Sequence, residues 1–452
     1  MSKQRVVNFR KVVNALDQIN RNAAGVDVGS EEMYVAVPPD RDKESVRSFP
    51  TFTADLHRLA DWLAACRIDT VAMEATGVYW IPLYEILETR GFRVFLVNAR
   101  HLKNVSGRKT DVLDCQWIQQ LHTYGLLSAS FRPPDQIVAI RSLSRHREML
   151  VQYRSAHIQH MQKALTVMNL RLTNVLSDVT GVTGMKIIRA IVAGERDPKV
   201  LARYRDDRCK RSEEDIVKSL EGHYKREQVF ALKQALELYD FYDEKVLDCD
   251  TELEALYRKF DIPQNPGTPP PSPRTSKRRK NQAYFDLPSA LYRMTGVDLT
   301  QVDGLDGLTI QKVLSETGTD MLKWPTVKNF ASWMRLFPNN KVTGNKVKQT
   351  RVLPTQNRAS NALRVAAASL AHSDSALGAF YRRMRASHGA PSAITATAHK
   401  MARIIYFMLK DHKSYHDVGS DYYEQRYKDR VLRNLHRQAA KLGYRLEPAP
   451  AS

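Results

Sequence analysis

Two aspartates, Asp111 and Asp114, stand three residues apart in the segment Arg108–Leu121, RKTDVLDCQWIQQL, where a helical pattern starts. On a helix this spacing puts both carboxylates on one face, where like charges repel. One explanation is local: Thr110 could cap the helix, and acids in a first turn complement the helix dipole. The alternative is that the pair binds a ligand or takes part in catalysis.

Two further acids occupy otherwise apolar places upstream. Asp27 lies in GVDVGS between Val26 and Val28, in a predicted strand where burial of an unpaired carboxylate would be costly. Glu74 ends the apolar run of AMEATGVYW, and the end of a strand is where α/β folds place functional groups. Both acids therefore need a cation or a hydrogen-bond donor nearby.

Four converging carboxylates cannot all stay ionised without cations. Their oxygen atoms suit Mg²⁺ or Mn²⁺, and two such ions about 4 Å apart can activate a nucleophile and stabilise a leaving oxygen in phosphoryl transfer. The acids at 27, 74, 111 and 114 therefore predict a divalent-metal site. For each acid taken singly, a helix cap or a surface charge remains the alternative.

The chain has a strong excess of positive charge. Its 452 residues include 69 lysines and arginines against 49 aspartates and glutamates, a formal net charge of +20. Such a field attracts phosphate polymers or anionic lipid, and without a lipidation signal or amphipathic anchor it favours nucleic acid. Solubility alone is the alternative explanation, because a basic composition is only the first sign of a nucleic-acid-binding protein.

The composition predicts a modular globular protein of about three domains. No apolar run reaches about 18 residues and the N-terminus lacks the apolar core of a signal peptide, so we expect a cytoplasmic protein with no membrane partner. The cysteines have no paired spacing, which predicts reduced thiols rather than a zinc site or disulfide framework. They are Cys66, Cys115, Cys209 and Cys249.

The first part of the chain alternates between strand and helix patterns. Ala23–Val37 predicts two strands joined by a tight turn, and Thr70–Met73 and Phe92–Val97 predict two more. Leu56–Cys66 and Tyr84–Thr89 read as helices between them. This order predicts a mixed sheet with covering helices.

The rest of the chain is mainly helical. From Ile140 to Lys259 the pattern is almost wholly helical, with possible coiled-coil character but no secure heptad register. Pro263–Asn281 is rich in proline, serine and basic residues with almost nothing to bury, which predicts a flexible linker. A further domain follows from Tyr284 to Leu409, and Tyr422–Leu446 is an arginine-rich helical pattern with interleaved aromatics.

The order GVDVGS, AMEATGVYW and NARHLKNVSGRKTDVLD resembles the DEDD transposases of the insertion-sequence-110 family, in particular their insertion-sequence-1111-like branch. The resemblance covers about Ala23 to Leu409. It implies an α/β RNase H-like (RuvC-like) N-terminal domain of the Holliday-junction-resolvase type, and Lys109 matches the family pattern. The four family acids are matched residue by residue by Asp27, Glu74, Asp111 and Asp114.

Two C-terminal segments extend the resemblance. Val302–Gly318 resembles the helix-hairpin-helix-like opening of the family's C-terminal transposase domain, in which a hairpin can present backbone N–H groups to phosphate. A Gly-rich turn between helices is the common alternative. Trp333–Leu370 resembles the family segment that carries a Pro, a Ser-Gly, a basic stretch and an Asn before a helix.

The chain departs from the family pattern at the serine proposed as a nucleophile that joins covalently to DNA. That serine falls on Thr343 when Pro338 and Gly344 are aligned. A threonine hydroxyl can attack phosphorus, but its β-branch hinders it and the alcohol needs a base or a metal. Ser360 is the fallback position, although a lone hydroxyl near a turn is ordinarily structural.

Basic residues around Thr343 are expected to form a phosphate-binding face, with a solvated basic surface as the alternative. They are Lys341, Lys346, Lys348, Arg351, Arg358 and Arg364.

Pattern and resemblance together predict six segments. These are a basic N-terminal arm (1–22), the RNase H-like catalytic domain (23–139), a long helical, coiled-coil-like domain (140–260), a linker (261–283), the mainly α-helical C-terminal transposase domain (284–412) and a basic tail (413–452).

We therefore expect a DNA transposase or recombinase of a mobile insertion sequence, with Mg²⁺ or Mn²⁺ held by the four acids. The resemblance further implies a structured guide RNA encoded by the element and a homo-oligomer, dimer or tetramer, with sites that join different protomers. Two alternatives remain open: a metal-dependent Holliday-junction-type resolvase without an RNA guide, and a catalytically inactive nucleic-acid-binding regulator.

Overall fold

A computed structural model describes residues 17–98, 111–272, 280–337, 339–344, 346–351 and 357–447. The chain divides between Arg132 and Pro133 into two compact units. Within the described ranges, no helix combines the length and the hydropathy that a membrane span requires. All four cysteines are free and three of them are buried, which confirms the prediction of reduced thiols.

The first unit is built on a five-stranded mixed sheet in the order β3-β2-β1-β4-β5. The strands are β1 (Ala23–Val28), β2 (Glu32–Ala36), β3 (Val46–Pro50), β4 (Thr70–Glu74) and β5 (Arg93–Val97). The first three are antiparallel, and β4 and β5 run parallel to β1. The predicted mixed sheet is confirmed.

Strand β3 was not predicted. It lies at the edge of the sheet and all its residues are at least partly exposed, so its sequence, VRSFP, has no continuous apolar run. A proline at its end is tolerated because an edge strand leaves one row of backbone groups unpaired. Edge strands of this kind give a weak periodic signal.

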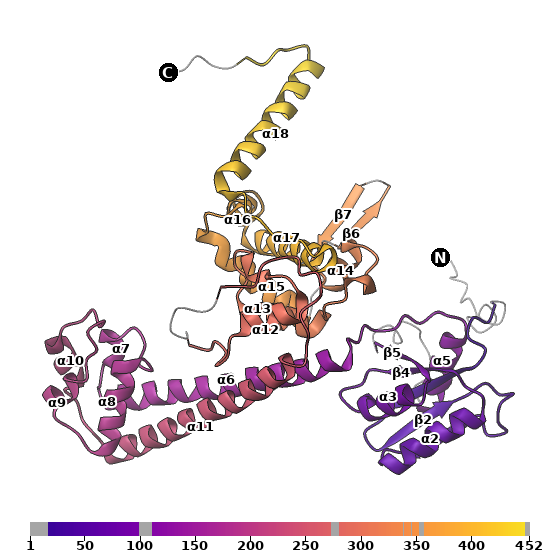
Figure 1. The fold of residues 1–452 in the computed structure, drawn as a ribbon, viewed down its shortest axis with the longest axis horizontal. Coiled ribbons are helices and arrows are strands. Elements are labelled where there is room, and N and C mark those ends of the chain that lie inside the picture. Colours follow the sequence, from indigo (N-terminus) through magenta and orange to yellow (C-terminus); the bar gives the residue numbers. More distant parts are fainter. Residues whose placement is uncertain are drawn as a thin grey trace, which may run out of the picture. The chain divides into compact units, whose positions relative to one another are not determined.

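Helices cover both faces of the sheet (Figure 1). Helices α2 (Thr53–Ala65) and α3 (Trp80–Thr89) pack on the face that carries Val26 and Met73. Helix α5 (Asp111–Thr123) packs on the other face through Ile118 and Leu121, against Ala72 and Val97. The unit is therefore a three-layer α/β structure, with one apolar core on each side of the sheet.

Gly25, in the middle of β1, lets α5 lie directly against the strand. A Cβ atom at this position would stand 2.2 Å from the backbone N of Gln119 and 2.4 Å from the backbone O of Cys115. Glycine inside a strand is the expected residue where another backbone approaches this closely. The contact fixes the height of α5 above the sheet.

The second unit begins with a pair of long helices, α6 (Asp135–Val167) and α11 (Arg226–Tyr257), which pack along each other. Short helices lie between them in the chain: α7 (Leu172–Val175), α8 (Val182–Ala193), α9 (Pro198–Ala202) and α10 (Glu213–Leu220). An apolar core that includes Met161 and Ile187 joins these short helices to the far end of the pair. The predicted helical region is confirmed.

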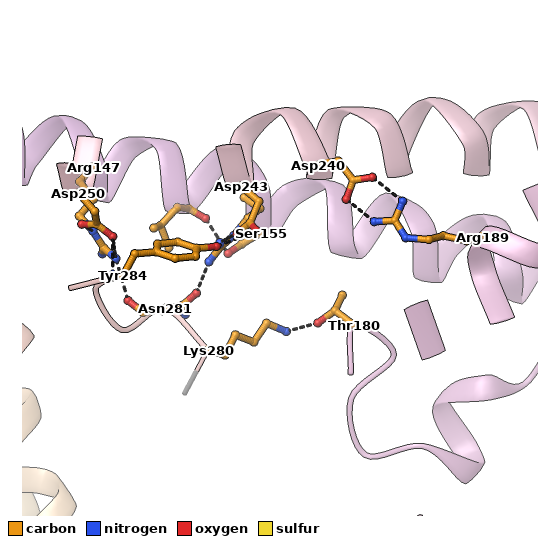
Figure 2. Close-up of polar contacts among 12 residues, drawn as sticks. Arg147, Ser155, Thr180, Arg189, Asp240, Asp243, Asp250, Lys280, Asn281 and Tyr284 are labelled. Carbon is orange, nitrogen blue, oxygen red and sulfur yellow. Dashed lines mark hydrogen bonds and ion pairs between the residues drawn. The ribbon is translucent and has the colours of Figure 1, made fainter. Parts of the chain in front are cut away.

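The long helices are also joined by buried charge (Figure 2). Arg147 of α6 pairs with Asp250 of α11, and their side chains are 6% and 1% exposed. The chain crosses this pair at 280–284: the carbonyl of Asn281 accepts from Arg147, and the backbone N–H of Tyr284 donates to Asp250 over 3.1 Å. Removal of either partner would leave an uncompensated buried charge.

The expectation that Pro263–Asn281 has almost nothing to bury is wrong at Thr268, and the last residues of the segment make polar contacts although Lys280 is exposed. Thr268 is 5% exposed, and its carbonyl accepts a hydrogen bond from the hydroxyl of Tyr292. At the other end Lys280 donates to Thr180 (Figure 2). Lys280 also pairs with Asp178, and Asn281 accepts from Arg154 over 2.6 Å. The sequence pattern gave no sign of these contacts, because hydrophobic periodicity does not reveal hydrogen bonds and ion pairs between polar groups.

The remaining chain forms a mainly helical region with one hairpin. Its elements are α12 (Leu287–Thr295), η1 (Leu299–Gln301), α13 (Gly307–Thr317), η2 (Met321–Lys323), α14 (Val327–Trp333), β6 (Asn339–Thr343), β7 (Lys346–Arg351), α15 (Arg358–Ser369), η3 (Leu370–His372), α16 (Ala376–His388), α17 (Ala390–Asp411) and α18 (Gly419–Lys441). The antiparallel β6–β7 hairpin was not predicted.

The segment Val302–Gly318 contains a turn at Gly304, whose φ is +82°, and the helix α13. The carboxylate of Asp306 caps this helix by accepting from the backbone N–H of Thr309 over 2.8 Å. An acid at this end disfavours a phosphate there. The helix-hairpin-helix-like character of the segment stays a prediction.

We expect Gly25→Ala to destabilise the first unit. Its Cβ would collide with two backbone atoms of α5, neither of which can rotate away, and overpacking of this kind costs about 3 kcal/mol or more. Hydrogen–deuterium exchange of α5 and urea unfolding would measure the loss. The matched control is Gly91→Asn, because a Cβ at Gly91 meets no atom within 4 Å and Asn tolerates its positive φ. Equal stability of the two variants would contradict the described packing.

Candidate active site

Helix α5 runs antiparallel to the two central strands, and this direction decides where its acids lie. The side chain of Gln119 donates to the carbonyl of Ala23 at the start of β1. His122, near the end of α5, lies 2.9 Å from the hydroxyl of Thr70 at the start of β4. The amino end of α5 therefore lies toward the carboxyl ends of both strands.

The lengths of the elements agree with this placement. Asp111 stands eight residues before Gln119, about 12 Å along a helix, and Asp27 stands four residues after Ala23, about 13 Å along a strand. Asp111 and Asp114 in the first turn of α5 are thus brought to the edge of the sheet where β1 and β4 end. Glu74 is the last residue of β4 at the same edge.

The alternation of side chains along a strand puts Asp27 and Glu74 on the α5 side of the sheet. Gly25 contacts α5, so Asp27, two residues on, shares its face. Ala72 packs in the same core as Ile118 of α5, so Glu74, two residues further along β4, also lies on the α5 side of the sheet. In the parallel register Val26 is opposite Met73, and the next residues along are Asp27 and Glu74 on neighbouring strands.

Two of these acids change the pKa of the Cys115 thiol. Cys115 is fully buried, and burial together with the charge of Asp27, and to a smaller extent that of Asp114, raises its pKa to about 12. A carboxylate from β1 and one from α5 therefore act on the same sulfur atom. Cys115 stays a neutral thiol, so we assign it no chemical step.

The other two acids are less completely placed. Glu74 is half-buried, and its carboxylate accepts from the hydroxyl of Thr76 over 2.9 Å. Asp111 is the first residue of α5, but its side chain lies outside the described residues, as does Lys109 altogether. Among the side chains that the structure describes, no three acids, histidines or cysteines stand close enough to hold a metal together.

The donor set nevertheless fits a hard divalent cation. Asp27, Glu74 and Asp114 offer carboxylate oxygens at one edge of the sheet, and oxygen ligands are those that Mg²⁺ and Mn²⁺ prefer. The charges of two of them, Asp27 and Asp114, both raise the pKa of the buried Cys115 thiol. The structure thus places Asp27, Asp114 and Glu74 at one edge of the sheet, without gathering all three at one point.

Thr343, the predicted nucleophile position, is the last residue of β6. It pairs with Lys346 across the turn that contains Gly344, whose φ is +56°, and Thr343 is exposed. Ser360, the fallback, is 0% exposed in the first turn of α15. Of the two hydroxyls, only that of Thr343 is accessible to a DNA phosphate in this structure.

The predicted phosphate-binding face is only partly described. Arg358 pairs with Glu148 of α6, and Arg364 is half-buried and donates to the carbonyl of Arg335 over 3.3 Å, so a phosphate would have to share or replace these partners. Burial also lowers the pKa of Arg364. The remaining predicted residues lie on the β6–β7 hairpin, but their side chains are outside the described residues: Lys341, Lys346, Lys348 and Arg351.

Sequence reasoning missed the residues that hold α5 in place. Gly25 lies in the run AAGVDV, and a glycine inside an apolar strand pattern could have indicated a close backbone approach. His122 gave no such signal. It is 1% exposed, and its burial and the charge of Arg93 lower its pKa to about 4, so it acts as a neutral core residue.

Two protein-family models match the chain. Residues 24–169 match a transposase model of the DEDD, IS110 type, and residues 298–382 match the transposase model of the IS116/IS110/IS902 family. The first range contains the four candidate acids and the second contains Thr343 and Ser360. No curated protein matches the chain. The matches do not resolve the insertion-sequence-1111-like branch.

We expect Asp27→Asn and Asp114→Asn to leave the melting temperature unchanged or to raise it when divalent metal is removed. In the predicted metal site each substitution removes one of several like charges that the cation would neutralise, and about 1 kcal/mol corresponds to about 2–4 °C in a domain of this size. Asp27→Asn should also lower the pKa of Cys115 in a thiol titration.

Mg²⁺ should then raise the melting temperature of the unchanged protein more than that of either variant. The control is Asp69→Asn, because Asp69 is an exposed acid directly before β4, at the opposite edge of the sheet. A Mg²⁺ effect that is the same in all four proteins would place the cation elsewhere.

Proposed function

This chain belongs to the IS110 family of DEDD transposases, and from that premise we propose that it cuts and rejoins DNA at the ends of its element and at a target site, guided by a structured RNA that the element encodes. It is a transposase of an insertion sequence and acts on DNA. The RNA guide and the homo-oligomer, dimer or tetramer, rest on the family resemblance alone.

The observation that carries the proposal is the direction of α5, which brings the acids of its first turn to the carboxyl ends of β1 and β4. The strand order supports an RNase H-like fold, because three antiparallel strands followed by two parallel ones, with helices on both faces, is the arrangement of such folds. Acids on three different elements then share one edge.

In this proposal Asp27, Glu74, Asp111 and Asp114 hold the divalent cation. When bound, the cation activates a nucleophile and stabilises the leaving oxygen of a phosphodiester. The protein's own contribution is position: β1 and β4 are central strands, and the Gly25 contact fixes α5 above them. Ligands on packed elements of this kind are held in place before DNA binds.

Thr343 is the proposed second part of the site. Its hydroxyl is exposed at the end of β6, on a hairpin whose sequence is rich in lysine and arginine. If its oxygen attacks phosphorus, a phosphate ester to Thr343 forms as one bond from the phosphorus to a DNA sugar oxygen breaks, and the hydroxyl proton must pass to a base. The family resemblance implies that a C-terminal domain, of the same or another protomer, completes the site.

We expect recombination between a donor-junction plasmid and a target plasmid to need the acids. Asp111→Ala and Asp114→Ala should reduce product by a factor of about 10² or more, because each removes a proposed metal ligand. Asp69→Ala, at the opposite edge of the sheet, is the control and should retain activity. Full activity of both acid variants would show that Asp111 and Asp114 are not metal ligands and serve only as charges at the end of a helix.

The same assay with the element's flanking noncoding DNA supplied or withheld tests the RNA guide. Products that need the flanking DNA as an RNA source support guidance. Products that form without it would show that the enzyme acts on DNA by itself, as a junction resolvase would.

Substitutions at Thr343 separate a covalent mechanism from simple hydrolysis. We expect Thr343→Ser to retain or increase a covalent protein–DNA product, because it keeps the hydroxyl and removes the β-branch, and Thr343→Ala to abolish it. Ser360→Ala is the matched control, since Ser360 is buried. Gel separation of denatured protein–DNA product measures the outcome. Full cleavage by Thr343→Ala would favour the resolvase mechanism.

A further inference from the structure

A cluster of cations and aromatic rings joins α16, α17 and α18. Arg383 of α16 lies over the rings of Tyr423 and Tyr427 of α18, 4.9 and 4.1 Å from their centroids. Lys400 of α17 lies 3.9 Å from the ring of Phe380 and 5.1 Å from that of Tyr423. The basic-aromatic cluster comprises these residues together with Arg403 and Arg430.

Within the ranges that the structure describes, the cations of this cluster have no acid partners. Among the described residues no carboxylate forms an ion pair with Arg383, Lys400, Arg403 or Arg430, although ion pairs are frequent elsewhere in the chain. Burial, reinforced by the three arginines, lowers the pKa of Lys400 to about 8. The protein therefore concentrates positive charge here at a cost to its own folding, and an anionic ligand would relieve that cost.

A cavity opens beside the cluster. It has a volume of about 490 Å³, within the range of about 300–1,000 Å³ that holds small organic ligands. The cluster and the cavity wall share Lys400, Arg403 and Tyr423. Apolar side chains of the same wall are Ile404, Phe407 and Met408. The site thus offers positive charge for a phosphate and an apolar, aromatic space of suitable size for a planar ring.

We propose that this cluster and its cavity bind unpaired nucleotides of a nucleic-acid strand. Lys400, Arg403 and Arg430 contact phosphates, while a base enters the cavity beside Phe407 and Tyr423. Single-strand sites combine backbone cations with aromatic rings in this way. The inference rests on the proposed function only in taking nucleic acid as the partner.

Helix α18 extends the same surface. None of its residues is buried, and it packs on α16. Its sequence holds six lysines and arginines against three acids, so a strand leaving the cavity meets further positive charge. The competing explanation is that the cation–π contacts simply attach α18 to α16 and α17, or that α18 contacts a second copy of the chain.

The binding test uses the full chain and fluorescently labelled 20-nucleotide oligothymidine, oligouridine and duplex DNA. The double variant Lys400→Met with Arg403→Gln removes two proposed phosphate contacts. Each phosphate contact to a single strand contributes about −0.7 to the slope of log affinity against log salt concentration. The slope of the double variant should therefore be less negative by about 1.4. The control is Lys218→Met with Arg211→Gln, which removes the same charges from exposed positions at and before α10 and should leave the slope unchanged.

Stability and pH separate binding from a structural role. Because the folded protein disfavours the charged form of Lys400, Lys400→Met should keep or raise the melting temperature at pH 7 while it weakens binding. Affinity of the unchanged protein should fall between pH 7 and 9, as Lys400 loses its proton, and Lys400→Arg should abolish that dependence. The charged groups around Lys400 are Arg383, Arg403 and Arg430, whose charges lower its pKa, and Asp411 and Lys413 of the cavity wall. Burial raises the pKa values of Tyr415 and Tyr423, which also line the cavity.

Several outcomes would overturn the proposal. The first is an equal salt dependence of binding for the double variant and its control. The second is tighter binding of duplex than of either single strand. The third is a double variant that loses self-association but still binds the oligonucleotides. Preference for oligouridine over oligothymidine would assign the site to RNA, and the reverse to DNA. If recombination fails while oligonucleotide binding follows these expectations, the proposed function is wrong and this inference stands.

Discussion

The edge of the sheet that carries the candidate acids depends on one contact, the packing of α5 against the backbone of β1 at Gly25. With no side chain at that position, the backbone of α5 at Cys115 and Gln119 approaches the strand directly. The helix then spans the sheet face with its last turn at Thr70 and its first turn at the opposite edge. A larger residue at 25 would lift the helix and move its acids away from those on the strands.

Helix capping alone does not explain that geometry. A cap needs only one carboxylate near one helix end, whereas here acids come from a strand, the next parallel strand and a helix. Asp27 and Asp114 act on the same buried thiol. Acids contributed by separate elements to one edge of a sheet are expected where a cation is to bind. The second unit shows the opposite arrangement of charge, because Arg147 and Asp250 pair and neutralise each other.

The sequence predicted the central sheet and the helical regions, because buried strands and long amphipathic helices have clear periodicity. It did not predict β3, whose residues are all at least partly exposed, or the β6–β7 hairpin, whose sequence is strongly polar. The contacts of Thr268 and Asn281 were missed because they depend on hydrogen bonds between residues far apart in the chain. Likewise, the aromatic pattern of the tail was visible, but its junction with Arg383 and Lys400 required the fold.

The most direct test of the account is to map the metal site by cleavage of the backbone. Fe²⁺ bound in place of Mg²⁺ generates hydroxyl radicals with ascorbate and peroxide, and these cut the chain beside the ion. If α5 brings its acids to those of β1 and β4, cuts should appear together near Asp27, Glu74 and Asp114, and Mg²⁺ should suppress them. Cuts confined to one of these segments, or unchanged in Asp114→Asn, would contradict a site shared by the three elements.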